Sequence, residues 1–164
     1  MLPTEIRQPL EERIAASSHP RELVVDILYA LQHHYGYLHD EGLLEAAALL
    51  GLDPVEVEEL ATFYDFIYRQ PVGRFVIHLC DGLVCWMHEE RSALAYLCKR
   101  LGVEPGQTTV DGQFTVLPTA CIGYCDHAPA MLVNGKFYGP MDPESIDRLL
   151  DELRNMSCDL AICR

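Results

Sequence analysis

The chain has 164 residues, of which 49% are hydrophobic, and it carries a formal net charge of −13. This length and apolar content suffice for one packed domain, or for one domain with a helical extension. The excess of carboxylates opposes binding to phosphate backbones and anionic membranes, and every apolar run is far shorter than the roughly 20 residues of a membrane-spanning helix.

The N-terminal sequence MLPTEIRQPLEER is charged and lacks the apolar segment of a secretory signal. We therefore expect a cytoplasmic protein without direct membrane insertion. Cytosolic thiols are kept reduced, so the seven cysteines of the chain favour metal binding or redox chemistry over structural disulfides.

Residues 1–70 are expected to form a helical N-terminal region. Apolar residues recur at helical spacing from Arg21 to Tyr35, and Gly36 follows as a stop signal. Glu41 to Leu50 predicts a short second helix. The sequence Asp53-Pro54-Val55-Glu56 then supplies an N-cap carboxylate, a proline at the first helical position and a glutamate at the third, which predicts the start of another helix.

Two short helices joined at Gly51 could suggest a helix-turn-helix DNA-binding motif. The segment from Glu41 to Asp65, however, holds seven acidic residues and no lysine or arginine. A recognition helix with this charge would be repelled by phosphate, so we expect no nucleic-acid partner.

The pattern after Pro71 is that of an α/β domain, which we expect to span residues 71–157. The order β-α-β-β-β-α is that of a small sandwich similar to thioredoxin, and residues 158–164 form a C-terminal tail. The predicted strands are Arg74–Leu79, Phe114–Leu117, and the hairpin of Ala130–Val133 with Phe137–Tyr138 around Asn134-Gly135; the predicted helices are Glu89–Leu101 and Pro143–Asn155 with Asp142 as N-cap.

Four cysteines form two pairs, Cys80 with Cys85 and Cys121 with Cys125, and each pair follows a predicted strand in a loop that contains glycine. Glycine allows tight turns that bring backbone amides toward sulfur, as iron–sulfur clusters require. Four thiolates on two loops can complete the coordination of both irons of a [2Fe–2S] cluster. The residues alone therefore indicate a four-thiolate metal site, with an iron–sulfur cluster favoured.

Three alternative roles for these cysteines differ in strength. A structural zinc site uses pairs two to four residues apart, and the first pair lies at the upper edge of that range, so zinc stays open. A thioredoxin-type redox site needs C-x-x-C, a spacing that the chain lacks. Ordinary core cysteines would lie on an apolar stripe, whereas these lie beside glycine, aspartate and histidine.

The remaining cysteines and two histidines are assigned no cluster role. Cys98 shares a helical face with leucines and is expected to be buried. Cys158 and Cys163 repeat the C-x4-C spacing but lack a second pair and glycines, which indicates a reduced tail. His88 and His127 flank the cysteine loops, yet a Rieske-type site is disfavoured because four cysteines already complete the ligand set.

Beyond spacing, the chain resembles a known family over roughly residues 10–155. The motifs C-D-x-x-V-C, P-G-Q-T-T-x-D-G-x-F-T-x-L-P-T and C-x-G-x-C-D-x-x-P are similar to those of the NuoE-type thioredoxin-like [2Fe–2S] subunits of bacterial NADH:quinone oxidoreductase, the respiratory complex I. The upstream sequence ATFYDFIYRQPVGR matches the joint between the helical extension and the ferredoxin domain of that family.

This resemblance implies an α/β fold with a helical N-terminal extension followed by a thioredoxin-like [2Fe–2S] ferredoxin domain. It further implies one [2Fe–2S] cluster bound by Cys80, Cys85, Cys121 and Cys125, without catalytic residues on this chain. The sequence lacks G-x-G-x-x-G and Walker motifs, so FMN and NADH are expected on a partner subunit only. The implied partner is the FMN/NADH-binding flavoprotein subunit, within a larger respiratory complex that is peripheral to the cytoplasmic membrane.

The chain would thus be a non-autonomous subunit of an NADH dehydrogenase that transfers electrons. Two alternatives remain open: the equivalent diaphorase subunit of an NAD-dependent hydrogenase or formate dehydrogenase, and a zinc-bound structural or interaction subunit. Trp86, next to Cys85, is expected to shield the cluster or to pack at an interface. Asp81 and Asp126 add negative charge beside the cysteines, which predicts a low reduction potential.

Overall fold

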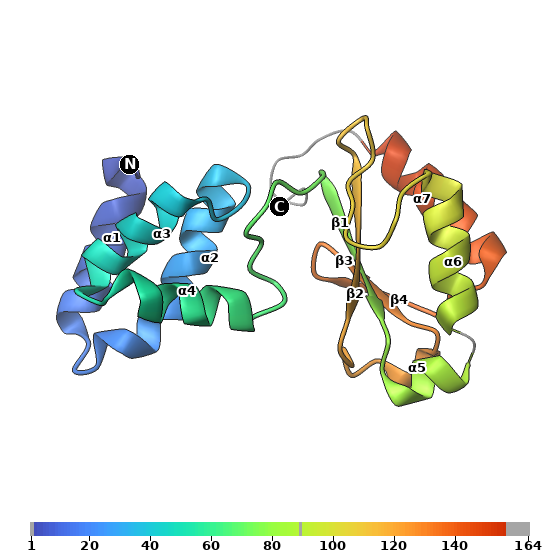
Figure 1. Ribbon diagram of the computed structural model, residues 1–164, viewed down its shortest axis with the longest axis horizontal. Helices are drawn as coiled ribbons and strands as arrows, with labels where there is room; N and C mark the ends of the chain where they lie inside the picture. Colours follow the sequence, from blue (N-terminus) through green and yellow to red (C-terminus); the bar gives the residue numbers. More distant parts are fainter. Residues whose placement is uncertain (1, 89, 157–164) are drawn as a thin grey trace. The chain divides into compact units, whose positions relative to one another are not determined.

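The computed structural model describes residues 2–88 and 90–156 of the chain (Figure 1). Within it the chain divides into two compact units, the first ending at Pro71 and the second beginning at Val72. Each unit has its own buried apolar core. None of the helices in the described ranges combines the length and the hydropathy that crossing a bilayer requires.

The first unit is entirely helical. Its helix α2 buries Ile27, Leu28 and Leu31 on one face, and these residues share a core with Val57 from a later helix. Gly36 ends α2 with a positive φ of 87°, as its position in the sequence predicts. The elements are α1 (Thr4–Ala16), a 3-10 turn (Pro20–Leu23), α2 (Val24–Tyr35), α3 (Asp40–Leu50) and α4 (Pro54–Phe63).

The N-cap of α4 was predicted from the sequence, whereas the N-cap of α3 was not. Asp53 accepts a hydrogen bond from the Val55 N–H at 2.8 Å, and Glu56 accepts one from the Asp53 N–H, so the predicted capping box of α4 is confirmed. Helix α3 is instead capped by His39, whose Nδ1 accepts from the Gly42 N–H at 2.9 Å. Histidine is not among the residues that usually cap helices, so this contact has no clear sequence signal.

We expect Asp53→Ala to lower the free energy of unfolding of the helical unit by about 1 kcal/mol, because the first amides of α4 lose their acceptor. Urea denaturation followed by circular dichroism measures the change. The matched control is Glu59→Ala, on the exposed face of the same helix, which should change stability by less than about 0.5 kcal/mol. Equal effects of the two substitutions would show that the cap contributes nothing specific.

The second unit is a four-stranded sheet with two longer helices, α6 and α7, on one face (Figure 1). The strand order is β2-β1-β3-β4, in which β1 and β2 are parallel and the other neighbours are antiparallel. The order of strands in the chain agrees with the predicted thioredoxin-like arrangement. The elements are β1 (Phe75–Cys80), α5 (Leu83–Met87), α6 (Glu90–Leu101), β2 (Phe114–Thr119), a 3-10 turn (Cys125–His127), β3 (Met131–Val133), β4 (Lys136–Tyr138) and α7 (Pro143–Asn155).

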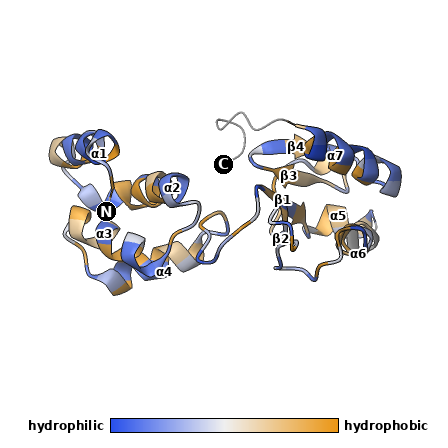
Figure 2. Cartoon of the chain, turned by 90° about the horizontal axis from the view of Figure 1, so that it is seen from above, coloured by the Kyte–Doolittle hydropathy of each residue, from blue (hydrophilic) through white to orange (hydrophobic). Residues whose placement is uncertain are grey.

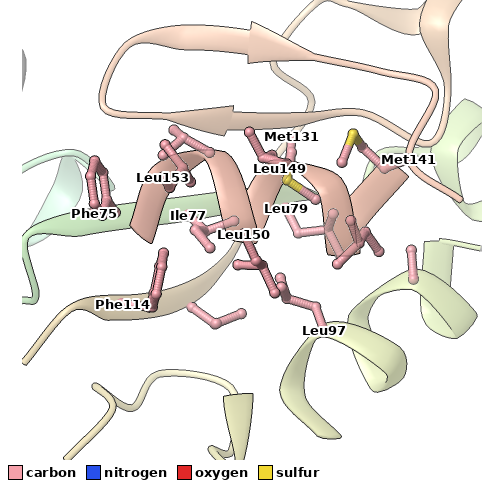
Figure 3. Close-up of a cluster of buried hydrophobic side chains, with 14 of the residues drawn as sticks. Phe75, Ile77, Leu79, Leu97, Phe114, Met131, Met141, Leu149, Leu150 and Leu153 are labelled. Carbon is pink, nitrogen blue, oxygen red and sulfur yellow. The ribbon is translucent and has the colours of Figure 1, made fainter. Parts of the chain in front are cut away.

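The core of this unit lies between the sheet and its helices (Figure 3). Phe75, Ile77 and Leu79 alternate along β1 and pack against leucines of α6 and α7, among them Leu97 and Leu150. Because side chains alternate across a strand, the next residue, Cys80, points to the opposite face. The packing of β1 thus separates the apolar core from the cysteine at its end.

Several element bounds in this unit differ from the sequence prediction: β1 begins at Phe75 and not at Arg74, and β2 continues to Thr119. Strand β1 extends one residue further, so Cys80 is its last residue and not the first residue of a loop. Cys85, which was expected in a loop, lies in the one-turn helix α5. Five residues are too few for a helical period to be recognised, which explains why α5 was not predicted.

Candidate iron–sulfur site

The four predicted cysteines meet at one edge of the sheet. Since β1 and β2 are parallel, with Cys80 opposite Thr119, their carboxyl ends lie side by side, and the segments that follow them are neighbours. The first segment carries Cys85 in α5, and the second carries Cys121 and Cys125, the latter at the start of a 3-10 turn. The parallel pairing therefore brings together two cysteine pairs that lie far apart in sequence.

The four sulfur atoms interact with one another across the two segments. The thiol of Cys80 interacts with those of Cys85 and Cys121, and the Sγ atoms of Cys121 and Cys125 are 3.6 Å apart. Gly82 allows this approach: a Cβ atom there would lie 3.0 Å from the Cys121 Cβ and 3.3 Å from the Cys80 Sγ. A larger residue at position 82 would push the two segments apart.

The four cysteines differ in burial. Cys80 and Cys85 are each only 1% exposed and pack with Ala130 in a small apolar cluster; we call them the inner pair. Cys121 is exposed and Cys125 is half-buried, and we call these two the outer pair. A group bound by all four sulfurs would be shielded from water on one side and accessible on the other.

Backbone amides donate to two of the sulfurs. Burial raises the pKa of Cys85 to about 11, and this effect outweighs a hydrogen bond from the Ala130 backbone that lowers the pKa. A hydrogen bond from the Gly123 amide lowers the pKa of Cys121. The hydrogen bond between Cys121 and Cys125 raises the pKa of Cys125. Gly123 has a φ of +82°, which non-glycine residues rarely adopt, and this turn directs its amide toward sulfur.

Aromatic rings border the outer pair. Tyr124 stacks on His127 with centroids 4.3 Å apart, and it also contacts Phe137 of β4. His127 Nδ1 lies 3.1 Å from the Asp126 carboxylate and lowers its pKa. The sequence motif gave no sign of the contact with Phe137, because it depends on how the hairpin folds back over the cysteine loop.

The chemistry of this donor set suits a [2Fe–2S] cluster. Such clusters are bound by four cysteine thiolates, and amide hydrogen bonds to sulfur tune them. Within residues 2–88 and 90–156, no three His, Cys, Asp or Glu side chains are grouped closely enough to hold a metal ion as they stand. The four thiols nevertheless interact with one another as an inner and an outer pair.

Cys98 and Trp86 differ in their positions relative to the site. Cys98 belongs to the core between the sheet and the helices, as predicted. Trp86 is 52% exposed, so about half of its surface is accessible to solvent. Cys158 and Cys163 lie outside the described residues.

The fold and the cysteine site together define a thioredoxin-like iron–sulfur protein. In agreement, the family model "Thioredoxin-like [2Fe-2S] ferredoxin" matches residues 10–154. The chain belongs to this family, and its cofactor is a [2Fe–2S] cluster used in electron transfer.

Individual relatives agree with this assignment. The chain is 38% identical over 148 residues to the E subunit of NADH-quinone oxidoreductase from Escherichia coli K12, covering 90% of this chain and 89% of the relative. It is 37% identical over 145 residues to the corresponding protein of Pseudomonas aeruginosa, covering 88% and 87%. Among solved structures, the H2-reduced NAD+-reducing [NiFe]-hydrogenase matches 80% of this chain with 32% identity and a TM-score of 0.68. This chain spans only 22% of that longer hydrogenase chain.

Proposed function

We propose that this chain is the electron-transfer subunit of an NADH:quinone oxidoreductase and lies next to the subunit that binds FMN and NADH. Its [2Fe–2S] cluster would be held by Cys80, Cys85, Cys121 and Cys125. The observation that carries the proposal is the convergence of these four thiols at one sheet edge. Relatives that match nearly their whole length supply the biological context.

The inner and outer pairs would bind opposite sides of the cluster. When bound, the cluster supplies one-electron redox chemistry. The inner pair would hold it against the apolar cluster around Ala130, where water is excluded. The outer pair would hold the side that faces solvent, so a redox partner must approach from there. The chain would be located at the cytoplasmic membrane through the assembled complex.

We expect helix α5 to contribute to the surface that the partner contacts, because Gly82 at its start lies against Cys121 of the outer pair. Leu83, Trp86 and Met87 are 72%, 52% and 69% exposed, although they flank the buried Cys85; we call these three residues the α5 face. Figure 2 shows α5 in the colours of hydrophobic residues. Apolar side chains concentrated this way mark interaction sites, and aromatic residues and methionine are enriched in protein interfaces.

The charge around this surface indicates the kind of partner. Residues 80–88 and 121–128 contain Asp81 and Asp126, both exposed, and no lysine or arginine. Complementary charges steer association. We therefore expect the flavoprotein to present an apolar face with a basic rim.

The hydrogenase neighbour supports a diaphorase role less strongly. It matches this chain at a similar identity, but only as a small part of a much longer polypeptide, whereas the relatives from quinone-reducing complexes match over nearly their whole length. We therefore favour the quinone-reducing complex over a hydrogenase or formate dehydrogenase.

The function is tested by adding NADH to the cluster-loaded chain with and without the flavoprotein. We expect the visible absorption of the cluster to persist with NADH alone and to bleach once the flavoprotein is added, because the nicotinamide and flavin sites lie on the partner. A matched mixture without NADH controls for slow loss of the cluster. Bleaching by NADH alone, or no bleaching with the partner, would contradict the proposal.

A further inference from the structure

The outer pair has a geometry that permits chemistry between its own two thiols. The Sγ atoms of Cys121 and Cys125 are already in contact at 3.6 Å within a single loop. A disulfide requires about 2.05 Å between the sulfurs. Both side chains project from one loop that turns at Gly123, and we expect rotation of the side chains to cover the remaining approach.

We propose that Cys121 and Cys125 form a reversible disulfide when the chain lacks its cluster, and that this disulfide prevents the cluster from being inserted. The oxidant is a small soluble disulfide of the oxidised-glutathione class. The bond itself is independent of the proposed electron-transfer role. Its effect on cluster insertion rests on the assignment of the outer pair as ligands.

Burial selects this pair among the four thiols. Cys80 also interacts with Cys121, and it interacts with Cys85 as well, so contact between sulfurs alone would allow other pairings. Both inner thiols are only 1% exposed, however, whereas Cys121 is exposed. In the first exchange step a thiolate attacks a sulfur of the small disulfide in line, which a buried thiol cannot reach, so Cys121 reacts first. For the second step we expect Cys125 to be the partner, because it lies in the same loop with its Sγ 3.6 Å from that of Cys121.

The reaction proceeds by two exchange steps. Cys121 loses its proton, and its thiolate attacks one sulfur of oxidised glutathione, forming a mixed disulfide and releasing one glutathione thiolate. Cys125 then loses its proton, and its thiolate attacks the Cys121 Sγ, which releases the second glutathione. Two protein thiols are thereby oxidised, and one glutathione disulfide is reduced to two thiols.

The product cannot serve as half of a ligand set. Thiolates ligate metals, and the sulfurs of a disulfide no longer carry that charge. Conversely, sulfurs already bonded to iron are not free to attack glutathione. A chain could therefore hold either the cluster or the Cys121–Cys125 disulfide, but not both. The ratio of thiols to disulfides in the surroundings would decide whether new chains accept a cluster.

The test uses the full chain with Cys158→Ser and Cys163→Ser, so that the C-terminal cysteines do not complicate the thiol count. The cluster is removed with a chelator, and the chain is equilibrated without oxygen in mixtures of reduced and oxidised glutathione. Iodoacetamide then labels free thiols, and mass spectrometry of peptides locates each bond. We expect a Cys121–Cys125 disulfide, with the inner pair labelled only after unfolding. Cluster uptake should be lost, and dithiothreitol should restore it.

A matched variant tests the second exchange step. In Cys125→Ser the second exchange step is impossible, so we expect Cys121 to remain as a mixed disulfide with glutathione. An outer pair that stays reduced in oxidised glutathione, or a disulfide that includes Cys80 or Cys85, would overturn the proposal. Unchanged cluster uptake by the oxidised chain would show that the disulfide does not prevent cluster insertion. None of these outcomes depends on the flavoprotein, so they are distinct from failure of the electron-transfer proposal.

Discussion

Replacing Cys80, Cys85, Cys121 or Cys125 by alanine one at a time is expected to strip the [2Fe–2S] cluster or destabilise it severely. Each substitution leaves an iron with an incomplete thiolate set. The loss should be most severe for the inner pair, because alanine there also places an unfilled position inside a buried apolar cluster. Visible absorption of the purified protein, normalised to chain concentration, measures the cluster content of each variant.

The control for these substitutions is Cys98→Ala. This cysteine is also buried, but it belongs to the core between the sheet and the helices, so its removal tests the effect of losing any buried thiol. Cluster content should remain that of the parent chain. Full cluster content in a Cys121→Ala or Cys125→Ala variant would show that the outer pair does not ligate iron.

The second large effect is expected at the α5 face. The double substitution Trp86→Ser and Met87→Ser should weaken binding of the flavoprotein by at least about 2 kcal/mol, or roughly 30-fold, because large side chains at the centre of an interface dominate its energy. Both side chains are exposed, so the fold and the visible spectrum of the cluster should be retained. Isothermal titration of the loaded chain with the flavoprotein measures the affinity.

The matched control is Val110→Ser, which removes a fully exposed apolar side chain from the loop before β2. It should leave the affinity within about twofold of the parent chain, since scattered exposed apolar residues are common and carry little binding energy. Equal binding by the α5 double variant and the parent chain would show that the partner docks elsewhere.

The elements that the sequence predicts well are those whose signals are local. Helix α7 begins and ends as predicted. Its start is determined locally, because Asp142 accepts from the Ser145 N–H and Pro143 occupies the first helical position. The hairpin turn at Asn134-Gly135 is also confirmed, with φ values of 45° and 84° that favour these two residues. In both cases a few neighbouring residues determine the backbone.

The elements that were missed depend on distant contacts. Helix α5 is a single turn, and helix α1 contains Pro9 and buries only Leu10, so neither shows a clear apolar period. The cysteine site also depends partly on contacts between residues distant in sequence. Spacing and strand ends predict which cysteines come together, but the depth of the inner pair depends on packing around Ala130. The exposure of Trp86 likewise follows from the position of α5 against the rest of the unit.

We propose that four thiols at one sheet edge hold a binuclear iron–sulfur cluster. The most direct measurement is the metal and acid-labile sulfide content of the chain purified without oxygen, combined with electron paramagnetic resonance after reduction. We predict two irons and two sulfides per chain, as the family name states, and a paramagnetic signal that appears on one-electron reduction. One zinc per chain with no acid-labile sulfide and no signal would contradict the account.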